Sequence, residues 1–113
     1  MASLNRVFLV GNLTRDPDCR YTAGGKAVGN FGLALNHRYM SASGEEREES
    51  SFIEIEVVGD MAEKSREQLG KGSLVYVEGR LRLAAWKDKR SGRKRHRLKV
   101  SARQVQALTD ENR

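Results

Sequence analysis

Alternating apolar and polar residues fill most of the chain in short segments. Apolar side chains occupy mostly every second position in 27–36, 52–58 and 73–86. Alternation of this kind is typical of β-strands that bury one face. Two further segments, 6–10 and 95–102, are rich in β-branched residues or alternate in the same way, so five main strands are predicted. The residues predicted to point inward are Phe31, Leu33, Leu35, Ile53, Ile55, Val57, Val75, Val77, Leu81, Leu83, Ala85, His96, Leu98, Val100 and Ala102.

One segment, Met61–Leu69, is predicted to be helical. Asp60 is the expected N-cap, with Glu63 at capping-box spacing, and Gly70 is the expected stop. The segment has few apolar residues, so we expect the helix to lie against the mouth of a barrel. The polar, glutamate-rich stretch Met40–Ser50 is predicted to be a long exposed loop.

The order of these elements is three strands, one helix and two strands. That order predicts an all-β protein with an OB-fold, a five-stranded Greek-key barrel with one short helix between strands 3 and 4. An SH3-like or sandwich closure would produce a similar alternation. A chain of 113 residues has room for one domain, so we assign 1–108 to that domain and 109–113 to a short C-terminal end.

Charge adds a preference for an anionic partner. The 21 Lys and Arg residues exceed the 15 Asp and Glu residues, for a net charge of +6. Such a balance favours nucleic acid or an acidic membrane surface. The cations concentrate near the C-terminal end, whereas six glutamates lie between Ser43 and Val57. The concentrated cations are Lys87, Lys89, Arg90, Arg93, Lys94, Arg95, Arg97, Lys99 and Arg103.

The same sequence excludes several other classes. No apolar run is long enough for a transmembrane helix, and no secretory signal is visible. The single cysteine, Cys19, predicts a reduced, cytoplasmic protein. His37 and His96 are not at paired-ligand spacing, and no nucleophile–base motif is present. We therefore predict no catalytic residue, no metal site and no cofactor.

Two aromatic residues lie on strand faces that should be polar. By alternation Trp86 points away from the core, on the same face as Arg80 and Arg82. Phe52 likewise lies opposite the inward face of its strand. Proteins that bind single strands stack bases on aromatic side chains within a cationic groove, and this pattern indicates such a surface. The alternative is a Trp86 that is buried against the next strand.

The first strand, which Gly11 and Asn12 are expected to end, is apolar on both faces. Val7 and Leu9 suit the core, but Phe8 and Val10 point the other way. An apolar second face is typically covered by another subunit. We therefore predict that Phe8 and Val10 form an oligomer interface.

Several motifs together resemble the bacterial single-stranded DNA-binding protein family over residues 4 to about 108. The motifs are Asn5–Pro17 with Arg20-Tyr21, Gly29–Ala34, Gly59 with the helix after it, Lys71–Arg82, and Trp86. The resemblance implies an OB-fold subunit that coats unpaired DNA without strong sequence preference. Such subunits usually form a homotetramer, and a dimer is the alternative assembly. The implied setting is replication, recombination and repair in the bacterial cytoplasm, at the nucleoid.

The resemblance also implies roles for particular residues. The stacking aromatics of the family fall on Tyr39, Phe52 and Trp86, and a fourth falls on Val58, which is not aromatic. Because Tyr39 shares parity with core residues, it is expected to lie beyond a bend. The cations expected to contact phosphates are Arg80, Arg82, Lys87, Lys89, Arg95 and Arg97.

Departures from the family pattern lead to further expectations. Glu54 and Glu56 share the face of Phe52 and should repel phosphates, so weaker binding is expected. The family's acidic C-terminal tip is not seen, so no partner among replication and repair proteins is assigned. Its absence fits either a shortened chain or a tailless paralogue. One alternative is a primosome-type replication-restart protein of the same fold. Another is an assembly protein whose basic hairpin docks an acidic partner protein.

Overall fold

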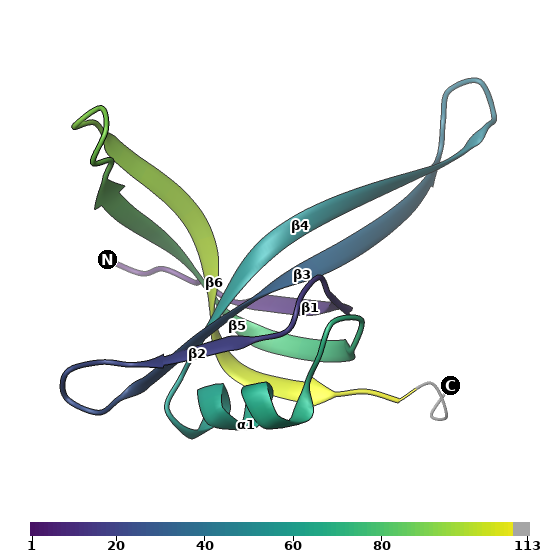
Figure 1. Ribbon diagram of the computed structural model, residues 1–113. Coiled ribbons are helices and arrows are strands. Elements are labelled where there is room, and N and C mark those ends of the chain that lie inside the picture. Colours follow the sequence, from purple (N-terminus) through teal and green to yellow (C-terminus); the bar gives the residue numbers. More distant parts are fainter. Residues whose placement is uncertain (110–113) are drawn as a thin grey trace.

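The computed structural model describes residues 1–109, and the elements are arranged around one barrel (Figure 1). The elements are β1 (Val7–Leu13), β2 (Asp18–Tyr21), β3 (Ala27–Met40), β4 (Glu46–Val58), α1 (Asp60–Gln68), β5 (Leu74–Lys87) and β6 (Lys94–Ala107). The predicted C-terminal end lies outside the described residues, except for its first residue.

Five of these strands close into a ring. β1 pairs with β5, β5 with β6, β4 with β3, and β3 with β1, all antiparallel, while β4 and β6 pair in parallel at Ile55 and Val100. The short strand β2 adds to the edge of β3. The helix follows the third strand of the ring and precedes the fourth. The predicted OB-fold barrel is therefore confirmed.

The barrel interior is filled by the inward residues of the alternating segments. The largest fully buried side chains are Phe31, Leu33, Ile55, Val57, Val75, Val77 and Val100. Each was expected to point inward, because burial of one strand face requires apolar side chains at every second position.

Helix α1 covers one end of the barrel, as expected. Ala62 is fully buried there, and Met61 and Leu69 pack against the core. The predicted capping box is wrong, because the N-cap is Gly59 and no side chain caps the helix. Gly59 has a φ of 68°, a conformation that favours glycine, and this lets the chain turn directly from β4 into the helix. The helix ends at an extended Leu69 instead of a left-handed glycine.

The expected loop at Met40–Ser50 is instead the outer half of a β-hairpin. Strands β3 and β4 stay paired as far as Met40 and Glu46, and the turn between them is short. Both faces of this ribbon are exposed, so no hydrophobic alternation marks it as strand. The expected break at Gly11 is also wrong. A Cβ at Gly11 would clash with the carbonyl oxygen of Ala34, so glycine there lets β1 approach β3 closely.

The β5–β6 hairpin likewise extends beyond the barrel. Val100 and Ala102 are buried, as expected. His96 and Leu98 are exposed, so the expectation that these two residues point into the core is wrong. Leu83, which pairs with Leu98, is 61% exposed. Their face continues the inward face of the strands past the end of the barrel, where no core is left to cover it.

Candidate nucleic-acid interface

Two long hairpins, β3–β4 and β5–β6, rise from the barrel and diverge, with α1 at the other end (Figure 1). Trp86 lies near the end of β5 and is 44% exposed. The strand register places Arg80 and Arg82 on its face, as predicted, together with Arg97 and Lys99 from β6. The guanidinium carbon of Arg97 lies 5.7 Å from the centre of the Trp86 ring, within cation–π range.

Phe52 lies on β4, opposite Ala34 of β3, and is 72% exposed. It lines an open hollow of about 290 Å³ at the base of the two hairpins. The lining residues are Thr14, Arg15, Gly32, Phe52, Ile53, Glu54 and Arg97. Arg97 therefore connects Trp86 and Phe52, because it lies over Trp86 and also borders the hollow of Phe52.

The alternative in which Trp86 is buried against the next strand is wrong, because its side chain is 44% exposed.

The two glutamates beside Phe52 are each paired with an arginine. Arg15 Nη2 donates to Glu54 at 2.5 Å. Arg82 Nη2 donates to both carboxylate oxygens of Glu56, at 2.9 and 2.8 Å. The two carboxylates that were expected to repel phosphates are therefore each offset by a guanidinium. Arg82 is also not a free cation, since Glu56 occupies it.

Tyr39 lies on the outer part of β3, away from Trp86 and Phe52. Its ring stacks on His37, with centroids 6.0 Å apart and planes 15° from parallel. The expected bend is absent, because β3 remains paired with β4 through Tyr39. Alternation along the strand places Tyr39 and Phe52 on opposite faces of the ribbon.

The other cations predicted to contact phosphates lie on both faces of the β5–β6 hairpin and in its turn. Lys87 pairs with Lys94 on the face opposite Trp86, whereas Lys89 lies in the turn between the strands. Arg95 is on the Trp86 face and lies 3.5 Å from Asp88. Within residues 1–109, Arg80, Arg97, Lys87 and Lys89 form no ion pair. Among the cations predicted to contact phosphates, these four are the ones that no carboxylate of the described residues neutralises.

Sequence reasoning did not assign Arg15 or Thr14 to this surface. Both follow β1, where strand alternation has ended and gives no direction for a side chain. A weak signal was Gly32 in the middle of an alternating strand, because glycine in a strand often marks a close approach. Lys99 was expected to point outward but was not proposed as a contact.

The predicted oligomer interface is an exposed apolar face on β1. Phe8 is 62% and Val10 56% exposed, and their register partners on β5 are Glu78 and Tyr76. The Tyr76 hydroxyl donates to Glu78. Burial, and then this hydrogen bond, raises the pKa of Tyr76 above its usual value. The face is thus apolar with a small polar cluster beside it.

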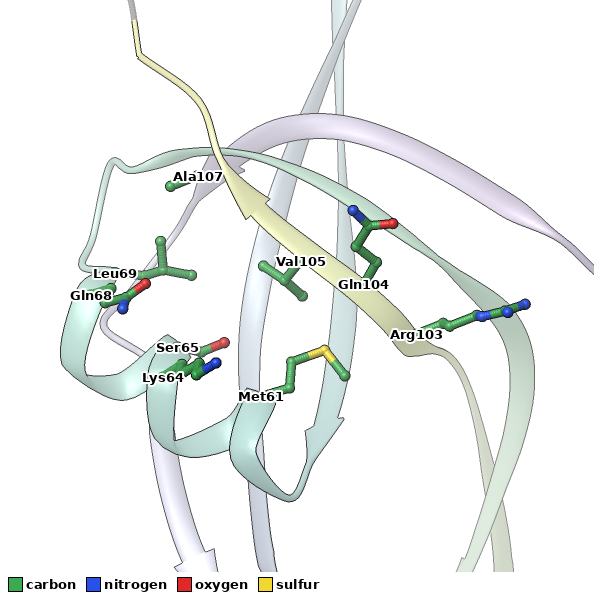
Figure 2. Close-up of a pocket in the computed structure, with 9 residues that line it drawn as sticks. All are labelled: Met61, Lys64, Ser65, Gln68, Leu69, Arg103, Gln104, Val105 and Ala107. Atoms are coloured by element: carbon green, nitrogen blue, oxygen red, sulfur yellow. The ribbon is translucent and has the colours of Figure 1, made fainter.

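A separate hollow of about 280 Å³ lies between α1 and β6. Figure 2 shows Met61 and Ser65 of the helix, and Leu69 directly after it, on the side of Val105 of the strand, whereas Arg103 lies further along β6 and points away from the helix. Neither Trp86 nor Phe52 lines this hollow. Residues 1–109 contain no cluster of metal-ligating side chains, and none of their helices is long and apolar enough to cross a membrane.

Comparisons with known proteins agree on the family. The single-strand binding protein family matches residues 4–108. A single-stranded DNA-binding protein of Helicobacter hepaticus is 42% identical over 104 residues, which cover 92% of this chain and 61% of that protein. The chain thus spans less than two thirds of that relative.

Solved structures match over nearly the whole chain. A deletion mutant of the single-stranded DNA binding protein from Thermus aquaticus has a TM-score of 0.85 and 38% identity, over 97% of this chain and 53% of that one. A Plasmodium falciparum protein of this kind, solved with single-stranded DNA, shares the fold, with a TM-score of 0.89 at 24% identity over 96% of this chain and 98% of that one. With a family match over residues 4–108 and this barrel, the chain belongs to the single-strand binding protein family.

Proposed function

We propose that this protein binds single-stranded DNA without strong sequence preference, by stacking bases on aromatic side chains and pairing phosphates with cations. The observation that carries the proposal is the placement of Arg97, which lies over Trp86 and borders the hollow of Phe52. An exposed aromatic, a cation and a second aromatic thus follow one another from the outer end of the β5–β6 hairpin to the hollow of Phe52. Stacking platforms beside cations are the usual means of binding single strands.

In this proposal the residues have distinct roles. Phe52 stacks on a base near the barrel, and Trp86 stacks on one at the outer end of the β5–β6 hairpin. Tyr39, on the opposite face of the β3–β4 hairpin from Phe52, offers a separate stacking site. The free cations described above contact phosphates, and Arg95 joins them from the same face as Trp86. No cofactor or metal is required, because stacking and ion pairing need none. The family match favours this function over the assembly-protein and replication-restart alternatives.

We further propose that residues 1–108 act as the binding domain of a homotetramer. The exposed face of Phe8 and Val10 supports self-association, since an apolar patch of this kind is usually covered. The protein would protect unpaired DNA during replication, recombination and repair, in the bacterial cytoplasm at the nucleoid.

Tryptophan fluorescence during titration with poly-dT tests the binding proposal, because Trp86 is the one tryptophan of the chain. We expect quenching that saturates, and an affinity that falls as salt is added. Poly-rU in a parallel titration measures the preference for DNA over RNA. If fluorescence and the anisotropy of labelled dT oligomers stay unchanged at low salt, the proposed function is wrong.

A further inference from the structure

Two carboxylates lie within the proposed DNA surface, next to a base-stacking residue. Glu54 and Glu56 alternate with inward residues of β4, so both share the face of Phe52. Each glutamate side chain is only 19% exposed, whereas the side chains of their partners Arg15 and Arg82 are 45% and 35% exposed. The arginines are therefore partly open to solvent.

The position of Arg15 depends on the residues around it. Gly32 lies opposite Glu54 in the register of β3 and β4. A Cβ at Gly32 would lie 2.9 Å from Arg15 Nη1, and closer still to Thr14 Oγ1. Arg15 thus reaches Glu54 by crossing β3 over Gly32, which has no side chain. The ion pair is consequently a built feature of the hollow beside Phe52.

We propose that Glu54 and Glu56 act as internal counter-ions that compete with DNA phosphates for Arg15 and Arg82, and so set the affinity of the surface. The proposal rests on the proposed function. A guanidinium offers the same fork of N–H donors to a carboxylate and to a phosphate. A phosphate that approaches either arginine must therefore displace the glutamate or share the guanidinium with it.

Competition of this kind has two consequences. Binding gains less from these arginines than from Arg97, which has no carboxylate partner within the described residues. The dependence on salt is also shallower than the number of cations on the surface indicates, because a neutralised arginine holds no anion that DNA can release.

The variants Glu54→Gln and Glu56→Gln remove each counter-ion while they keep the shape of the side chain. We expect each to tighten binding to dT oligomers at low salt by roughly two- to fivefold, the scale of a partly exposed ion pair. The slope of log K against log salt should steepen by about 0.7 per freed arginine, and the gain should shrink as salt rises.

A matched control is Glu49→Gln, which removes the same charge from β4 but lies on the outer hairpin opposite His37. It should change affinity much less than either test variant. Melting temperatures show whether each variant is folded at the assay temperature, and if Glu56→Gln is not, Glu54→Gln decides alone.

Two results would overturn the inference. Weaker binding in Glu54→Gln would mean that the glutamate orients its arginine toward DNA. A gain equal to that of Glu49→Gln would mean that only net charge matters. Either result leaves the proposed function intact, since that function fails only if the parent protein does not bind dT oligomers.

Discussion

Replacing Trp86 by alanine tests the stacking surface most directly. Stacking of one base on an aromatic side chain contributes about 1–3 kcal/mol, which corresponds to a loss of roughly 5- to 150-fold in affinity. Because Trp86 is 44% exposed and lies at the end of a hairpin, its removal opens no cavity in the core. The main interaction lost within the protein is with Arg97, about 0.5–1 kcal/mol for an exposed cation–π pair.

The assay is anisotropy of a labelled dT oligomer at several salt concentrations, because the variant has no tryptophan to report. We expect a weaker affinity and a nearly unchanged salt slope, since no charge is removed. Arg97→Ala should instead reduce the slope by about 0.7. Leu83→Ala is the matched control, because Leu83 is an exposed apolar residue on the opposite face of the same hairpin.

Thermal unfolding of the same variants separates stacking from folding. A loss of at most about 1 kcal/mol lowers the melting temperature by several degrees only. The reasoning is refuted if the folded Trp86→Ala variant binds as tightly as the parent, or if Leu83→Ala weakens binding equally.

Three further predictions concern stability and assembly. Gly79→Ala should lower the free energy of unfolding by about 1–3 kcal/mol in a denaturant melt, because its Cβ would strike a carbonyl of β6. Gly24→Ala should be neutral, because its Cβ would meet only Thr22 Oγ1, at 4.0 Å. Light scattering should show an oligomer for the parent and a smaller species for Phe8→Glu, and a monomeric parent would contradict the interface. Burial, and then the hydrogen bond to Glu78, raises the pKa of Tyr76 in the folded protein. The folded protein therefore keeps this proton at a pH at which the unfolded chain has lost it. Stability measured by thermal melts should therefore fall as pH rises past about 10, and less so in Tyr76→Phe.

The alternation of residues determined which strand faces are buried in the barrel. Phe31, Ile55 and Val77 are fully buried, as their positions predicted, because a strand buries every second residue. Alternation also placed Trp86 and Arg82 on one face. The order of strands and helix indicated the barrel, and the family motifs agreed with it. These features are local, so a single sequence is sufficient to reveal them.

Where the barrel ends was decided by the tertiary structure. Leu98 alternates in phase with Val100, yet only Val100 is buried, since alternation does not show how far the opposite wall of the barrel reaches. The strand pairing at Tyr39 is likewise invisible, because both faces of that ribbon are exposed.

The partners of the charged residues also came only from the structure. Arg15 and Glu54 are 39 residues apart in the chain, and the pair forms where Gly32 lets the arginine cross β3. Glu54 and Glu56 were expected to repel phosphates because they share the strand face of Phe52. The arginines that neutralise them come from other segments of the chain. An ion pair depends on distance in space, and only the closed barrel brings these segments together.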